Sequence, residues 1–241
     1  MEEKSSPELI AEGLEALNLD FSPEKVDLIQ SYLQLLLEEN RRHNLIGAEG
    51  ERTVIVDHFF DCLAPLQLED ISLTGPVMDL GTGGGLPGLL WAIMLPDIDI
   101  YLLDSRRKKV DFLRRVVKRL KLENCYPLQE RAEALGGDED FREKFSLVTA
   151  RAVASTSVLL EYALPLVRIG GSAGLFKGPS YPEELEDGER ASELLGGGSI
   201  EVRELNVPRL SAGRYFLLVQ KCRETPGRFP RRTGVPEKRP L

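Results

Sequence analysis

A run of glycines lies between a stretch that is patterned as a buried strand and one patterned as a helix. The segment VMDLGTGGGLPG, residues 77–88, has glycine at four of the five positions from 81 to 85. Glycine tolerates positive φ angles and lets a ligand approach the backbone closely. The helix that follows offers free N–H groups at its first turn. This segment therefore predicts a site for a nucleotide or nucleoside.

A carboxylate follows the glycines at the spacing that a nucleoside site needs. Asp104 ends the next apolar stretch, YLLDS, about twenty residues after the glycine loop. An acid at the end of the second strand accepts hydrogen bonds from the ribose hydroxyls of an adenosine. The loop and Asp104 together predict a cofactor that contains an adenosine.

Two cofactors fit this pattern. Gly83, Gly85 and Gly88 satisfy the dinucleotide pattern G-x-G-x-x-G, which keeps a nicotinamide-dependent oxidoreductase as an alternative. The order Asp79-x-Gly81-x-Gly83 instead begins at the strand end and favours S-adenosylmethionine. That cofactor carries a positive sulfonium and an amino group but no pyrophosphate, so an acid at the strand end attracts it. S-adenosylmethionine is the cofactor we expect.

The motifs that the chain lacks narrow the chemistry further. The fourth apolar stretch, FSLVTA, runs into Arg151, where enzymes that methylate exocyclic amines usually have Asn/Asp-Pro-Pro-aromatic. Cys62, Cys125 and Cys222 lack the Pro-Cys or Thr-Cys setting of a carbon-methylating nucleophile. A ring nitrogen such as guanine N7 already has a lone pair, so its methylation needs alignment and no general base. With two histidines and three scattered cysteines, we also expect no metal site.

The elements that must position these residues alternate along the chain. From residue 76 onward short apolar strands alternate with helices, which is typical of a parallel sheet covered on both faces. The expected strands are Pro76–Leu80, Ile100–Leu103, Asn124–Gln129, Ser146–Ala150, Gly171–Phe176, Ser199–Leu205 and Arg214–Lys221. The expected helices between them are Leu86–Leu95, Arg107–Lys121 and Ser155–Val167. With the last two strands antiparallel, this is the α/β plan of a Rossmann-like class I methyltransferase with a seven-stranded, mostly parallel sheet.

Three regions are expected along the chain. Residues 1–70 form an N-terminal helical extension, with two helices in residues 7–42 and another in residues 53–66. Residues 71–222 form the methyltransferase core. Residues 223–241 form a basic C-terminal arm, which we expect to be extended because it is rich in proline and glycine.

Composition and charge limit the classes of protein to which the chain can belong. The chain has 241 residues, 42% of them apolar and 29% charged, which excludes a mostly disordered protein. No leader pattern or long apolar run is visible, so we expect a cytoplasmic protein without a membrane partner. The net charge is −8, yet residues 106–121 hold nine Lys or Arg and one acid, and residues 221–241 hold seven and two. Such local positive surface on an acidic body suits a polyanion.

An ordered set of motifs resembles one family. The set covers residues 40–241 and comprises Asn44-Leu45, His58-x-x-Asp61, DLGTGGGLPG, LLDS, Arg131-Ala132-Glu133, Ala150-Arg151-Ala152, Lys177-Gly178 and the closing PRRTGVPEKRPL. It is similar to the bacterial 16S ribosomal RNA guanine-N7 methyltransferase G family, also called glucose-inhibited division protein B. The resemblance implies transfer of a methyl group from S-adenosylmethionine to one guanine N7 in the decoding region of 16S rRNA. The partner is then 16S rRNA, the small ribosomal subunit or its precursor.

The resemblance also implies which residues bind the cofactor. Its positions correspond to Gly81 and Leu86 in the loop, Ala132 and Glu133 after the third strand, and Arg151 after the fourth. The residue pattern adds three more, which are Gly83, Gly85 and Asp104. Arg151 contacts either the methionine carboxylate or the RNA, and with Lys177 it is a candidate catalytic residue. No catalytic residue is assigned beyond these two candidates.

RNA binding is expected at the basic segments. The expected contacts are Arg106, Arg107, Lys108, Lys109, Lys177, Arg214, Arg231 and Arg232. Lysine and arginine contacts to phosphate give affinity but not sequence choice. Two further alternatives stay open, a methyltransferase that acts on a small molecule and a module that binds RNA or protein without catalysis.

Overall fold

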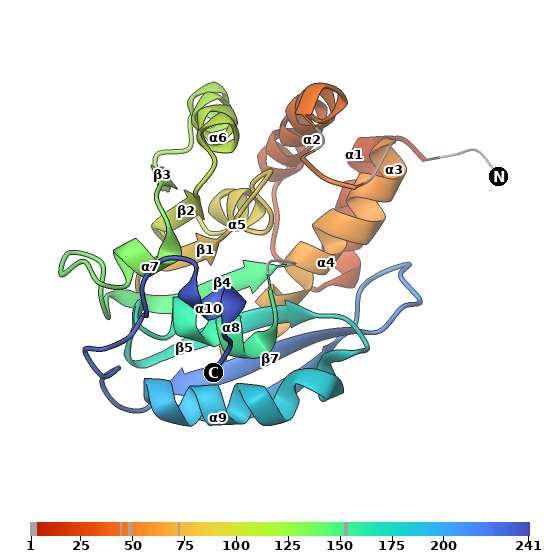
Figure 1. Ribbon diagram of the computed structural model, residues 1–241. Helices are drawn as coiled ribbons and strands as arrows, with labels where there is room; N and C mark the ends of the chain where they lie inside the picture. Colours follow the sequence, from red (N-terminus) through yellow and green to blue (C-terminus); the bar gives the residue numbers. More distant parts are fainter. Residues whose placement is uncertain (1–3, 44, 48–49, 72, 152–153) are drawn as a thin grey trace.

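The computed structural model describes residues 4–43, 45–47, 50–71, 73–151 and 154–241. Its centre is a seven-stranded sheet in the order β3-β2-β1-β4-β5-β7-β6 (Figure 1). The strands are β1 Val77–Leu80, β2 Ile100–Asp104, β3 Cys125–Gln129, β4 Phe145–Arg151, β5 Val167–Lys177, β6 Gly197–Leu205 and β7 Arg214–Lys221. Strand β7 is antiparallel to both neighbours, and all other pairs are parallel. The predicted α/β fold with a mostly parallel sheet is confirmed.

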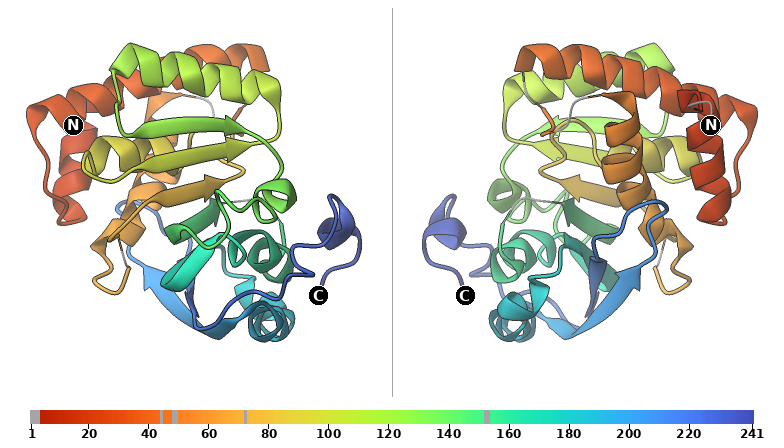
Figure 2. Two further views of the ribbon diagram at one scale, coloured as in Figure 1. Left: turned by 90° about the vertical axis from the view of Figure 1, so that its left-hand side faces the viewer. Right: turned by 90° about the vertical axis from the view of Figure 1, so that its right-hand side faces the viewer.

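Helices cover both faces of this sheet (Figures 1 and 2). The longer helices are α1 Ser6–Ala16, α2 Pro23–His43, α5 Gly88–Met94, α6 Arg107–Leu120, α8 Thr156–Ala163 and α9 Leu185–Leu195. The shorter ones are α3 Glu51–Thr53, η1 Val54–Phe59, α4 Phe60–Leu63, η2 Ala64–Gln67, α7 Ala132–Leu135, η3 Tyr181–Glu184 and α10 Val235–Lys238. Helices α1, α2, α5 and α6 pack on one face, and α7, α8 and α9 pack on the other. The single helix expected at 53–66 is a run of α3, η1, α4 and η2, with η1 a π-helix.

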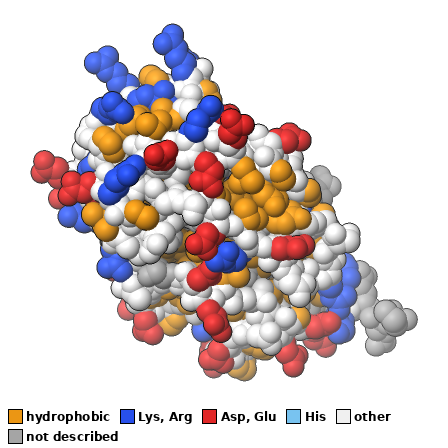
Figure 3. Space-filling model, turned by 90° about the horizontal axis from the view of Figure 1, so that it is seen from below, with side chains coloured by type: hydrophobic (Ala, Val, Ile, Leu, Met, Phe, Trp, Pro, Cys, Tyr) orange, Lys and Arg blue, Asp and Glu red, His pale blue; other side chains and the backbone are white. Residues whose placement is uncertain are grey.

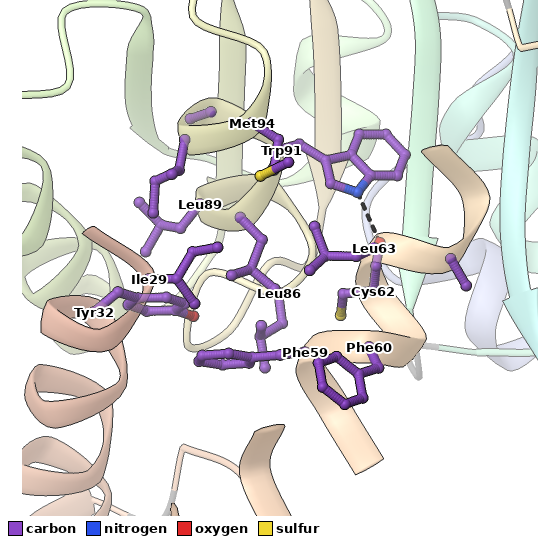
Figure 4. Packing of buried hydrophobic residues seen from close by; sticks show 14 of the residues in the cluster. Ile29, Tyr32, Phe59, Phe60, Cys62, Leu63, Leu86, Leu89, Trp91 and Met94 are labelled. Atoms are coloured by element: carbon purple, nitrogen blue, oxygen red, sulfur yellow. Dashed lines mark hydrogen bonds between the residues drawn. The ribbon is translucent and has the colours of Figure 1, made fainter. Parts of the chain in front are cut away.

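The side chains of successive strand residues pack alternately into two hydrophobic clusters, one on each face of the sheet. Val77 of β1 joins the cluster of the N-terminal helices, whereas Met78 beside it joins the cluster under α8. In the first cluster the rings of Tyr32 and Phe59 stack with centroids 5.3 Å apart, and the indole of Trp91 donates to a backbone carbonyl of α4 at 2.8 Å (Figure 4). Residues of the N-terminal extension and of the sheet thus share one core.

The C-terminal segment departs from the extended arm that proline and glycine content predicted. Residues 235–238 form the one-turn helix α10, which Gly234 precedes with a φ of 77°. Pro236 suits a first helical turn because its φ is fixed and the N–H it lacks would have no partner there. The Arg142 guanidinium donates to the carbonyl oxygens of Thr225 at 2.7 Å and Phe229 at 2.9 Å. These bonds hold the segment against the sheet domain.

Within the described ranges, no helix is long and apolar enough to cross a membrane.

Candidate cofactor and RNA site

The glycine-rich loop leaves the end of β1 in a conformation that side chains would not permit. Gly81, Gly83 and Gly85 have φ angles of 66°, 60° and 101°, in the region that favours glycine. The Tyr32 hydroxyl of α2 donates to the carbonyl of Gly84 at 2.9 Å, so a helix of the N-terminal extension holds the loop. Gly81 is exposed at the end of β1, and the rest of the loop, residues 82–86, is buried.

Asp79 fixes the loop from inside the protein. Its side chain is fully buried, and Oδ2 accepts hydrogen bonds from Thr82 Oγ1 at 2.6 Å and from the Gly88 N–H at 2.9 Å. Burial raises the pKa of Asp79 to about 7. The role that the structure shows for this carboxylate is to join the loop to the start of α5.

Asp104 lies where the sequence placed the ribose acid. It ends β2, beside the loop, and is 6% exposed. Its carboxylate accepts from the N–H groups of Gly83 at 3.2 Å and Arg106 at 2.9 Å, and Lys109 Nζ lies 3.5 Å from Oδ2. A carboxylate has about four lone-pair sites, so capacity for further hydrogen bonds remains.

A cavity of about 790 Å³ opens between the loop and the ends of β4 and β5. This volume is within the roughly 300–1,000 Å³ of small-molecule sites. The predicted residues that line it are Gly81, Gly83, Leu86, Lys109, Arg151, Lys177 and Arg214. His58 and Asp61 line it as well. The structure thus brings the loop and the basic residues of β4, β5 and β7 around one space, whereas Asp104 and Gly85 are not among the lining residues.

An ion-pair cluster forms one wall of this cavity. Arg151 Nε donates to Asp61 Oδ2 at 2.9 Å, and Arg151 Nη2 donates to His58 Nδ1 at 2.9 Å. Arg214 Nε lies 3.5 Å from Asp61 Oδ1. Burial, aided by the charge of Arg151, lowers the pKa of His58 to about 4. The His-x-x-Asp spacing is visible in the sequence, but its pairing with arginines of β4 and β7 is not.

Lys177, at the end of β5, is held in place by a partner that the sequence did not point to. Its Nζ lies 2.6 Å from Glu184 Oε2 and donates to the Ala154 carbonyl at 3.1 Å. Glu184 also accepts from the N–H of Thr156 at 2.6 Å and from its hydroxyl at 2.7 Å. These bonds join η3 to the start of α8 beside the cavity, which Lys177 and Glu184 line. No local signal marks Glu184, since it is one of several acids in residues 183–189.

On the expected adenine side of the site, Glu133 contacts the C-terminal segment. Ala132 and Glu133 begin α7, just beyond β3, and do not line the cavity. Glu133 is 7% exposed, and its Oε1 accepts from the Gly234 N–H at 2.8 Å. Arg231, expected to bind RNA, is ion-paired with Glu161 at 2.6 Å instead. Its neighbour Arg232 is exposed.

The basic start of α6 forms a second hollow beside the first. Arg106, Arg107, Lys108 and Lys109 line this hollow of about 380 Å³, and Lys109 belongs to both. The Arg107 side chain is 82% exposed. On the face shown in Figure 3, acidic side chains are spread between Lys and Arg that lie mainly toward its ends. Arg106, Arg107 and Lys108 are exposed, so the start of α6 is a concentrated positive surface on a chain whose net charge is −8. Asn44 and Ala152, part of the motif set, lie outside the described residues.

Comparison with known proteins identifies relatives over nearly the whole chain. Residues 25–212 match the family described as rRNA small subunit methyltransferase G. A protein of Carboxydothermus hydrogenoformans named ribosomal RNA small subunit methyltransferase G is 44% identical, over 92% of this chain and 94% of its own length. One of the same name from Alkaliphilus oremlandii is 37% identical, over 97% and 98%.

Solved structures agree at the level of fold. A Methanococcus jannaschii fibrillarin pre-rRNA processing protein superposes with a TM-score of 0.50 at 16% identity, covering 65% of this chain and 70% of that one. Because this identity is low, the likeness shows the fold alone. The family match decides against the nicotinamide-dependent oxidoreductase. With a loop, an acid and a basic surface at the expected strand ends and relatives at this identity, the chain belongs to the rRNA small subunit methyltransferase G family.

Proposed function

We propose that this protein transfers a methyl group from S-adenosylmethionine to N7 of one guanine in the decoding region of 16S rRNA. The substrate is the rRNA itself, the small subunit or its precursor, and the reaction takes place in the cytoplasm. Family membership supports the reaction and the substrate class. The observation that carries the proposal is the cavity that places the loop after β1 and the ends of β4 and β5 around one space.

The residues present fit the cofactor. Gly81 and Gly83 have positive φ angles and line the cavity, and the Gly83 N–H donates to Asp104 behind them. Asp104 would hold the ribose, while Ala132 and Glu133 would flank the adenine. When bound, S-adenosylmethionine supplies the methyl group from its sulfonium. Arg151 would meet either the carboxylate of the cofactor or the RNA.

The protein's own contribution is to orient the base and to exclude water. Arg151 is paired with Asp61, and Lys177 with Glu184, so these charges are neutralised locally. His58 uses its Nδ1 lone pair as an acceptor from Arg151. None of these groups is poised as a free general base. That arrangement suits methylation of a ring nitrogen whose lone pair already points at its target, where alignment lowers the barrier.

RNA would be held by the positive surface beside the cavity. Residues 106–108 at the basic start of α6 are exposed, and the half-buried Lys109 joins them to the cavity. Arg214 lines the cavity, and Arg232 is exposed on the C-terminal segment. Lys177, Arg214 and Arg231 each lie beside a carboxylate, so we propose that they shape the site and that contact with phosphate falls mainly to the exposed Arg106, Arg107, Lys108 and Arg232.

Methyl transfer in vitro tests this proposal. Labelled S-adenosylmethionine is incubated with the protein and either 16S rRNA or small subunits that lack the modification, and the label is mapped to a base. We expect label on N7 of one guanine, and its loss with Asp104→Ala. Cofactor binding without label on any RNA would contradict the RNA substrate and favour a small molecule.

A further inference from the structure

The order of the strands places the acceptor base on the far side of the loop from the ribose. Asp104 ends β2, the glycine-rich loop follows β1, and Arg151 ends β4, and these three strands are adjacent. A cofactor whose ribose lies at Asp104 and which crosses the loop reaches the end of β4. The half of the cavity beyond the loop, lined by His58, Asp61 and Arg151, is therefore the place for the base.

His58 lines this half of the cavity and has one defined hydrogen-bond donor. Arg151 has donors only, so the contact of 2.9 Å between its Nη2 and His58 Nδ1 requires Nδ1 to be the acceptor. In a neutral imidazole the proton then resides on Nε2. Within the described part of the chain Nε2 has no hydrogen-bond partner, although the residue lines the cavity. The ion-pair cluster thus fixes the Nε2–H tautomer of His58 and leaves that N–H available to a ligand.

The charges around His58 keep its ring neutral. Burial and the positive charges of Arg151 and Arg214 lower its pKa, and only Asp57 opposes them, so that the value falls to about 4. Asp61, the nearby carboxylate of the cluster, is itself bonded to Arg151 at 2.9 Å. A neutral N–H donor suits a neutral carbonyl oxygen, whereas the carboxylate of the cofactor would be matched better by an arginine.

Guanine and adenine differ in the substituent on C6, which lies on the same edge of the base as N7. Guanine carries O6, an acceptor, whereas adenine carries an N6 amino group, a donor. We propose that His58 selects guanine by donating its Nε2–H to O6, and that Arg151 is the positioning residue that fixes this donor. The inference rests on the proposed function and adds to it the residue that distinguishes the two purines. An adenine in the same position would set two donors against each other and leave both without an acceptor.

The test replaces atoms on the base and on the protein together. Small-subunit RNA is prepared with guanosine, inosine or 2-aminopurine riboside at the target position. Inosine keeps O6, and 2-aminopurine lacks it while keeping N7. The kcat/KM of methyl transfer is measured for the wild type, for His58→Leu and for His58→Gln, which keeps an amide N–H. Cofactor affinity and thermal unfolding of each variant show whether it is folded and binds S-adenosylmethionine.

We expect His58→Leu to lower kcat/KM on guanosine and inosine by roughly tenfold or more, the effect of one lost hydrogen bond in a buried site. Its kcat/KM on 2-aminopurine should not change, and His58→Gln should recover most of the loss on guanosine. An equal loss on all three bases, or a matching loss of cofactor affinity, would overturn the inference. A wild-type enzyme that methylates none of these RNAs would overturn the proposed function, and the inference with it.

Discussion

Arg231 forms a two-pronged ion pair with Glu161, whose carboxylate has no exposed surface. Nε lies 2.8 Å from Oε1 and Nη2 lies 2.6 Å from Oε2, and the Arg231 main-chain N–H donates to Oε1 at 2.9 Å. Glu161 is on α8, and Arg231 lies seventy residues further along the chain. Arg231 therefore anchors the C-terminal segment to α8. The basic composition of that segment had predicted that Arg231 binds RNA.

The first prediction concerns this anchor. Arg231→Ala should lower the free energy of unfolding by about 3 kcal/mol, because it leaves the buried Glu161 charge unpaired. Arg232→Ala, at the exposed neighbouring position, should change it by less than about 0.5 kcal/mol. Urea denaturation measures the free energy of unfolding of both variants, provided that their m-values equal that of the wild type. Equal effects of the two substitutions would show that the segment is not anchored in solution.

The second prediction concerns the ribose acid. Asp104→Asn should weaken S-adenosylmethionine binding by about 10- to 100-fold, the size expected for a lost charged hydrogen bond. Asp111→Asn, on the exposed side of α6, serves as the control and should leave the affinity unchanged. Isothermal titration with the cofactor measures both. Wild-type affinity in Asp104→Asn would remove this residue from the cofactor site.

The third prediction concerns the basic start of α6. Arg107→Glu should weaken RNA binding and reduce the slope of log K against log salt by about one, because one phosphate contact is lost. Folding should not suffer, since an acid in the first turn of a helix is favourable. Arg190→Glu on α9, which lies on the other face of the sheet, is the control. Filter binding to 16S rRNA at several salt concentrations measures the slopes, and equal slopes for Arg107→Glu and the wild type would place RNA elsewhere.

The fourth prediction is a dependence of stability on pH. Burial raises the pKa of Asp79 to about 7 from an ordinary value of 3.8, so between these values the folded protein holds a proton that the unfolded chain releases. The stability contributed by this group is present at low pH and is lost as the pH rises toward 7. Asp79→Asn cannot titrate, so its fall in stability from pH 5 to 7 should be smaller than that of the wild type by about 2 kcal/mol.

The exposed Asp97 provides the control for that experiment. Urea unfolding of Asp97→Asn should follow the wild type across the same pH range. If Asp79→Asn also follows the wild type, the carboxyl is ionised throughout and the buried loop stabilises its charge.

Local patterns were enough to predict the sheet and half of the site. The glycines at 81–85 and Asp104 were identified because positive φ angles and strand ends leave signals within a few residues. Short segments were harder to predict. Helix α9, Leu185–Leu195, was not expected because acids and glycines dilute its apolar stripe. The proline and glycine content around helix α10 argues against a helix, although Pro236 fits a first turn.

By itself the sequence determined the fold class, the cofactor loop and the family, because each depends on residues that are near one another in the chain. Only the tertiary structure decided the partners of the charged residues. Arg151 meets His58 across 93 positions, and Lys177 and Arg231 meet carboxylates on other elements. Whether an arginine binds RNA or a buried acid depends on which strand ends and helices the sheet order brings together, and the desolvation of the acid then requires the pair.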